Sequence, residues 1–125
     1  MIEVELDIET VNDCISAGIA VNILVKENGN EKKIDVLISK EFLEELKSDE
    51  VARLSNFSQD NNRDALIKAQ ENMSLKDILH NNMACIEATI AEKLQQVSNN
   101  QLNLAKYHLT LDKTDIDIFR RLTPR

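Results

Sequence analysis

His80 and His108 are the only side chains in this 125-residue sequence whose ordinary pKa lies near neutrality, so they are the first candidates for acid–base chemistry. Glu87 follows His80 by seven residues, which places the two on nearly the same side of a helix after two turns. A histidine beside a carboxylate can bind a metal ion or move a proton. The interpretation we favour is simpler: a boundary histidine near a surface carboxylate. His108 alternates with an apolar Leu109, so we expect it to face solvent or a neighbouring strand.

Other signatures of catalysis are missing from the sequence. Two glycines in the whole chain leave no room for a glycine-rich phosphate loop, and neither a Gly-x-Ser-x-Gly motif nor zinc-ligand spacing occurs. Cys14 and Cys85 are far apart in apolar surroundings, which is typical of free thiols that pack like small hydrophobic residues. We therefore assign no catalytic, cofactor-binding or metal-binding residue and expect no cofactor.

The charge balance is acidic, with 22 Asp and Glu against 15 Lys and Arg and a net charge of −7. Nonspecific nucleic-acid binding needs the opposite balance, because Lys and Arg must neutralise phosphates. Four scattered aromatic residues are also too few for a base-stacking platform. We expect no direct binding to nucleic acid.

Two groups of carboxylates could still bind something. The first lies along one face of the N-terminal strand and consists of Glu3, Glu5, Asp7 and Glu9. The second lies on a helix that begins near Ser39 and consists of Glu41, Glu44, Glu45, Asp49 and Glu50. Rows of carboxylates can bind hard cations, imitate nucleic-acid phosphates or meet a basic partner. Interspersed lysines dilute the second row, and a solvated surface is the simpler explanation for both.

Strand patterns occur at the beginning of the chain. Residues 2–8 alternate between apolar and acidic side chains, which predicts a half-buried strand. Asn28-Gly29 separates two further alternating runs and predicts a β-hairpin, because both central residues of a type I′ turn need positive φ. The two-residue turn sets a register that puts six side chains on one face: Ile19 with Ile38, Val21 with Val36, and Ile23 with Ile34.

Helices are predicted by their caps and apolar spacing. Thr10, with Asp13 three residues on and Gly18 beyond, predicts a short helix over residues 11–17 with Cys14 and Ile15 inward. Ser39 predicts an N-cap for a helix that breaks near Ser48-Asp49, followed by a weaker helix over 51–57. A further short helix is expected over 63–72.

The strongest helix signal begins at Ser74, which forms a capping-box variant with Asp77. An apolar stripe follows with steps of three and four residues: Leu79, Met83, Ile86, Ile90, Leu94 and Val97. Ala84, Ala88 and Ala91 form a second strip of small residues beside it. We expect the apolar stripe to cover the sheet. We interpret the alanine strip as a candidate interface, with another helix or with a second copy of the chain.

The C-terminal part is predicted to hold a strand over 107–111, with Leu109 and Leu111 inward. Thr114 with Asp117 is expected to cap a last short helix, and Arg120, Arg121 and Arg125 form a small basic tail. The elements together predict one α+β domain over residues 1–125. In it, a small antiparallel sheet of the N-terminal strand, the hairpin and the C-terminal strand packs against the long helix and shorter ones.

The segments Ile38-Ser39-Lys40-Glu41-Phe42-Leu43 and His108-Leu109-Thr110-Leu111-Asp112-Lys113-Thr114-Asp115 resemble those of a group of short bacterial and prophage-encoded domains. That group has a similar hairpin, a Ser-x-Glu-x-Leu helix start and a closing Leu-Thr-x-x-Asp-like strand end. The resemblance spans residues 19–118, and the N-terminal strand and the long helical region depart from it. It implies a bacterial or prophage origin and carries over no activity.

The sequence therefore favours a noncatalytic protein–protein interaction or regulatory module, with a homodimer as one form. Two alternatives remain open: a small enzyme that uses a histidine–carboxylate pair, and an acidic inhibitor that imitates nucleic-acid charge. The N-terminus has no signal-peptide pattern and no apolar run is long enough to span a bilayer, so we expect a cytoplasmic protein without membrane contact.

Overall fold

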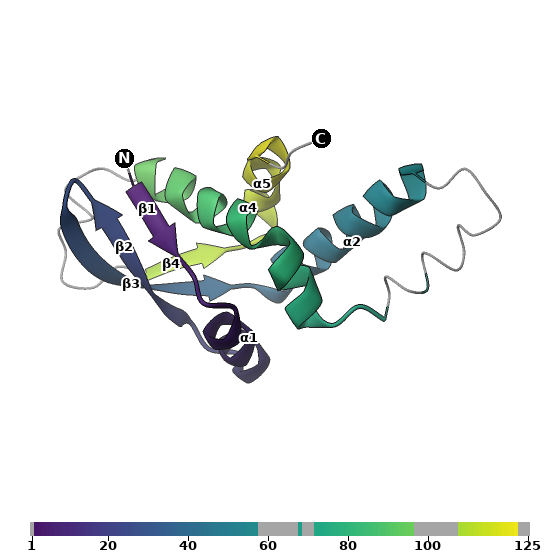
Figure 1. The fold of residues 1–125 in the computed structure, drawn as a ribbon, viewed down its shortest axis with the longest axis horizontal. Helices are drawn as coiled ribbons and strands as arrows, with labels where there is room; N and C mark the ends of the chain where they lie inside the picture. Colours follow the sequence, from purple (N-terminus) through teal and green to yellow (C-terminus); the bar gives the residue numbers. More distant parts are fainter. Residues whose placement is uncertain (1, 58–67, 69–71, 97–107, 123–125) are drawn as a thin grey trace.

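A computed structural model describes residues 2–57, 68, 72–96 and 108–122, and for residues 51–57 it describes the backbone alone. The sheet has four strands in the order β1-β2-β3-β4, formed by Ile2–Glu5, Val21–Glu27, Asn30–Ile38 and His108–Leu111. The helices are α1 (Ile8–Ala17), α2 (Lys40–Phe57), α4 (Leu75–Gln96) and α5 (Ile116–Leu122), with a short 3₁₀ helix η2 at Lys113–Asp115. Figure 1 shows α4 lying across the sheet and α2 extending away from it. The predicted α+β fold is confirmed.

The hairpin has the register that the turn chemistry predicts. Val21 pairs with Val36 and Ile23 with Ile34, and all four side chains are buried. Asn28 and Gly29 have φ angles of 50° and 82°, as a type I′ turn requires. This register gives the sheet one apolar face, onto which α4 packs, and one mixed polar face that is open.

Ile19 is the exception to that pattern. We expected it to face the core opposite Ile38, but it is 57% exposed and β2 begins two residues later. Gly18 has φ 71° and ends α1, and the backbone N–H of Ile19 binds the carbonyl of Cys14. This Schellman-type ending uses the backbone of Ile19 to close the helix, so it cannot extend the strand.

The end of the first strand and the start of the first helix also differ from the prediction. The N-terminal strand ends at Glu5, and α1 begins at Ile8 with Asp7 as its cap, because the Asp7 carboxylate accepts hydrogen bonds from both the N–H and the hydroxyl of Thr10. Thr10 therefore lies inside the first turn instead of capping it. Val11 is the buried residue of α1, while the expected inward residues, Cys14 and Ile15, are half-buried against the core.

The helix after Ser39 is continuous. The Ser39 hydroxyl accepts a hydrogen bond from the N–H of Phe42 at 3.2 Å, which confirms the predicted N-cap. The expected break near Ser48-Asp49 is wrong, since α2 runs on to Phe57. Arg120 of α5 binds Asp49 at this point, so a tertiary ion pair holds a segment that local propensity alone does not favour. The helix expected over 63–72 lies largely outside the described residues.

The closing strand changes the topology. Leu109 and Leu111 are buried as predicted, but β4 is parallel to β3, with Val36 opposite Leu109 and Ile38 opposite Leu111. The sheet is therefore mixed and not wholly antiparallel. The cap of the last helical segment is Asp112, in a capping box with Asp115, and not Thr114. Asp112 takes this role because its carboxylate accepts hydrogen bonds from the N–H and the hydroxyl of Thr114, while its own N–H donates to the Asp115 carboxylate.

Replacing Gly29 with alanine should lower the free energy of unfolding by about 1 kcal/mol, because the residue has positive φ. A Cβ at this position would meet no atom within 4 Å, so the cost is confined to the backbone. Urea denaturation measures the effect. Asn28→Gly, which is compatible with its φ of 50°, serves as the control and should change stability little. Equal stability of G29A and wild type would contradict the turn assignment.

Candidate functional site

Helix α4 carries His80, Glu87 and the alanine strip that the sequence singled out. Its start is fixed by Ser74, whose hydroxyl accepts from the N–H of Asp77 at 3.1 Å and donates to the Asp77 carboxylate at 2.8 Å. Its apolar side is anchored by Leu79, Ile86, Ile90 and Leu94, each 0% exposed. Met83 is half-buried against the same core, and Val97 lies outside the described residues.

Two polar residues on the buried side of α4 are satisfied within the helix itself. The amide of Asn82 donates to the carbonyl of Ile78 at 2.8 Å, and the hydroxyl of Thr89 donates to the carbonyl of Cys85 at 2.7 Å. Each bond reaches back four residues, a pattern available to short polar side chains in helices. These buried polar groups therefore have their hydrogen-bond partners inside α4 itself.

The opposite side of α4 carries few charges. From His80 to Gln96 its exposed residues contain no Asp, Glu, Lys or Arg, and we call the central part of this surface the α4 ridge. Its members are His80, Asn81, Ala84, Ala88, Ala91 and Gln95. Ala84 and Ala88 are exposed, whereas Ala91 is half-buried and packs against the core. The three alanines of the predicted strip thus lie on one side, with the last at its margin.

The three charged residues in the same stretch of α4 all have partners within the fold. Glu87 accepts a hydrogen bond from the backbone N–H of Leu6 at 2.9 Å. Glu92 forms an ion pair with Arg121 of α5. Lys93 binds Asp115 at 2.7 Å. The ridge residues themselves include no Asp, Glu, Lys or Arg, and one of them, Asn81, donates to the carboxylate of Glu50 on α2 at 3.1 Å.

His80 and Glu87, the sequence candidate for a polar site, have separate surroundings. His80 is exposed, whereas Glu87 is half-buried and holds the segment after β1. Two turns separate them along the helix, about 10 Å. The structure gives Glu87 a structural partner that sequence spacing could not indicate, because Leu6 is 81 residues away.

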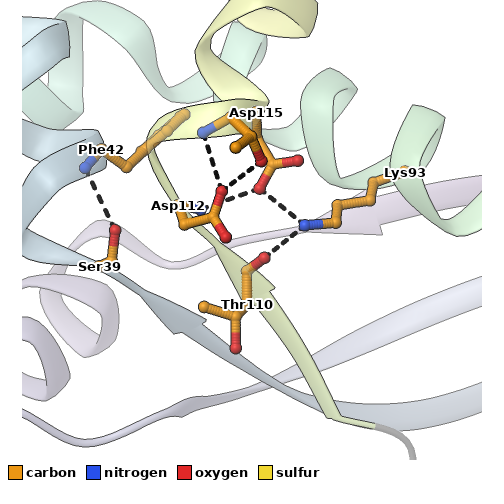
Figure 2. A network of polar contacts seen from close by, with 7 residues as sticks. Ser39, Phe42, Lys93, Thr110, Asp112 and Asp115 are labelled. Atoms are coloured by element: carbon orange, nitrogen blue, oxygen red, sulfur yellow. Dashed lines mark hydrogen bonds and ion pairs between the residues drawn. The ribbon is translucent and has the colours of Figure 1, made fainter.

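A junction of polar groups lies where β4 ends. The Lys93 ammonium donates to the backbone carbonyl of Thr110 and to the carboxylate of Asp115, as Figure 2 shows. Asp115 also accepts from the N–H of Asp112 at 2.9 Å. The side chains of Lys93 and Asp115 are 25% and 8% exposed, so the pair is largely removed from water. It joins α4, β4 and η2 at one point.

Asp112 has an altered acidity at the same junction. The hydroxyl and then the backbone N–H of Thr114 donate to its carboxylate, and these bonds lower the pKa of Asp112 below the ordinary value of 3.8. The ionised carboxylate is the form that caps η2, so the same hydrogen bonds that lower its pKa also stabilise the start of this helix.

His108 has a carboxylate partner that the sequence did not suggest. In the parallel pair of β3 and β4 it stands opposite Asp35, and its Nδ1 lies 3.5 Å from the Asp35 carboxylate. Asn22 of β2 donates to the same carboxylate at 2.9 Å. The three residues form a polar cluster on the open face of the sheet, where the His108 side chain is 70% exposed. Only knowledge of the parallel register could have predicted it.

The carboxylate rows expected from the sequence are divided among several tasks. Glu3 and Glu5 are exposed on β1, but Asp7 caps α1 and Glu9 pairs with Lys76. On the second row Arg120 binds Asp49 through two nitrogens, each at 2.9 Å, and reaches Glu45 at 3.1 Å. The expected basic tail thus contributes Arg120 to α2 and Arg121 to α4, while Arg125 lies outside the described residues.

Within the described residues, no three His, Cys, Asp or Glu side chains come together in a way that could hold a metal ion. The described helices include none that is both long and apolar enough to cross a bilayer. Comparison with known protein families, with curated proteins and with solved structures finds no match to this chain.

Lys93→Met should lower the free energy of unfolding by about 3 kcal/mol, because it leaves the Asp115 carboxylate buried without its cation. The double variant K93M/D115N should recover part of this loss, since no unpaired charge remains. Thermal or urea denaturation measures both. A loss of only a few tenths of a kcal/mol, typical of an exposed ion pair, would show that the junction is solvated.

The Asp112 cap should make stability depend on pH. Because its folded pKa is depressed, the carboxylate stabilises the fold fully above the unfolded pKa, near 4, and this contribution is lost as pH falls through the folded pKa. D112N retains a capping side chain without this titration, so the gap in stability between wild type and D112N should shrink on acidification. Denaturant titrations at several pH values measure the gap, with D13N controlling for loss of one negative charge. A gap that stays constant with pH would contradict the role of the ionised cap.

Proposed function

We propose that this protein is a noncatalytic protein–protein interaction or regulatory module whose contact surface is the α4 ridge. The observation that supports it most is the absence of charged residues among the exposed positions of α4 from His80 to Gln96, on a chain in which 30% of residues are charged. Interface centres are depleted of charge in the same way. The resemblance to short bacterial and prophage-encoded domains supports a bacterial or prophage source.

A second copy of the chain is the partner that fits the ridge most simply. Ala84 and Ala88 add little bulk, so the backbone of another helix can approach to the short end of the usual 8–10 Å interaxial range. Two copies related by a two-fold axis would place ridge against ridge. Because the chain carries a charge of −7, a neutral ridge is also where two copies can meet with the least repulsion.

The enzyme alternative has one observation in its favour, the His108–Asp35 cluster. A carboxylate on one imidazole nitrogen leaves the other free to exchange a proton, the arrangement of a general base. The cluster is on the open sheet face with His108 mostly exposed, whereas active sites usually enclose their substrate.

The inhibitor alternative is less supported, because Glu45 and Asp49 are bound to Arg120 and do not form a free row.

Ala88→Lys should dissociate the dimer, because it places an ammonium at the centre of the ridge. Light scattering and sedimentation velocity over a range of concentrations should show wild type tending to twice the monomer mass and A88K remaining monomeric. Ala17→Lys is the matched control: it makes the same substitution at an exposed alanine of α1 and should associate like wild type.

The outcomes separate the parts of the proposal. If A88K and A17K both dimerise as wild type does, the ridge is not the interface. If wild type is monomeric at every concentration, the partner is not a second copy. Pull-down from native cytosol with wild type and A88K as baits would then look for a different protein that is retained by wild type and lost with A88K.

A further inference from the structure

Strand β4 is at the edge of the described sheet, and its outward backbone groups can be identified from one hydrogen bond. The N–H of Ser39 donates to the carbonyl of Leu111 at 2.9 Å, so Leu111 directs its carbonyl toward β3. Carbonyls alternate in direction along a strand. Thr110 and His108 therefore direct their carbonyl and N–H groups away from β3, toward the open edge.

The Lys93 ammonium occupies this outward position. It binds the Thr110 carbonyl and is held there by Asp115, which is itself fixed by the N–H of Asp112 (Figure 2). A lysine that merely extended into solvent would exchange among many rotamers. Here the side chain is only 25% exposed and is anchored at two acceptors, so it is a built feature of the edge.

We infer that Lys93 closes the β4 edge against the addition of a strand, and that the strand it excludes is β4 of a second copy. Unpaired edges are templates for pairing with another chain, and a charged lysine is a common way to block them. A second β4 would fit well if the edge were open. Leu109 and Leu111 alternate with exposed His108 and Thr110, so two antiparallel β4 strands would align apolar with apolar and polar with polar faces.

This inference concerns a surface distinct from the α4 ridge and does not depend on the proposed function. It predicts that self-association through β4 is absent from wild type and appears when the ammonium is removed. The variants are therefore made in the A88K background, so that any contact through the ridge does not contribute to the measured mass.

The test compares K93M/D115N with D115N. The asparagine that D115N introduces retains an acceptor for the N–H of Asp112, and in this variant the ammonium still binds the Thr110 carbonyl. Sedimentation velocity, at a temperature where circular dichroism shows both variants folded, should give D115N the monomer mass. K93M/D115N should shift to at least twice that mass as concentration rises. A K93M/D115N protein that keeps the mass of D115N overturns the inference.

Thr110→Pro locates the contact. Because the Thr110 N–H faces outward, proline removes a donor that strand addition would need and no hydrogen bond to β3, and proline is tolerated at such edge positions. Adding T110P to K93M/D115N should return the protein to monomer mass. If T110P/K93M/D115N associates as strongly as K93M/D115N, both in the A88K background, the contact is not at the β4 edge and the inference is wrong.

Should K93M/D115N fail to fold, K93Q/D115N replaces it. The glutamine amide can still donate to the amide oxygen that D115N leaves at this position, but it carries no charge. A folded K93Q/D115N that associates, and is reversed by T110P, supports the closed edge. A folded K93Q/D115N that stays at the mass of D115N counts against it.

Discussion

Burial of the apolar stripe of α4 against the Ile and Val face of the sheet is the interaction on which the other features depend. Four α4 side chains and the four paired side chains of the hairpin, Val21, Ile23, Ile34 and Val36, are almost wholly removed from water. Each large aliphatic side chain buried in this way contributes about 2 kcal/mol. The register set by Asn28-Gly29 creates the face, and α4 is the only long described helix that lies across it (Figure 1). Once α4 is fixed there, its position determines which groups Glu87, Glu92 and Lys93 can contact.

Two of those flanking groups bind backbone groups at the two opposite edges of the sheet. Glu87, an anion, accepts the N–H of Leu6 just after β1, and Lys93, a cation, donates to the carbonyl of Thr110 in β4. A hydrogen bond between a charged side chain and a backbone N–H or carbonyl is stronger than one made by a neutral side chain. A short stretch of one helix thus connects the two outer strands, β1 and β4. The same use of charge leaves the α4 ridge neutral, which is the basis of its proposed role in binding.

The parts predictable from sequence were those encoded by neighbouring residues. The Val21–Val36 and Ile23–Ile34 pairs of the hairpin, the Ser39 and Ser74 caps and the burial of Leu79, Ile86, Ile90 and Leu94 follow from spacing of at most a few residues, and each is confirmed. The partners of Glu87 and His108 could not be predicted, because Leu6 and Asp35 approach them only after β1 and β4 have joined the sheet. The sequence around Ile19 is compatible with either a strand or a helix ending. Gly18, with its positive φ, ends α1 and makes Ile19 part of the helix ending.

The parallel direction of β4 has a consequence for how the chain is made. An antiparallel neighbour of β3 could follow it through a short turn, but a parallel one needs a connection that returns over the sheet, and here that connection includes α2 and α4. During synthesis the hairpin therefore emerges long before its last neighbour, and the free side of β3 stays unpaired until β4 itself has left the ribosome. Contacts so distant in sequence form slowly. Among the described strands β4 is thus translated last, and it joins the sheet only after the other three have been synthesised.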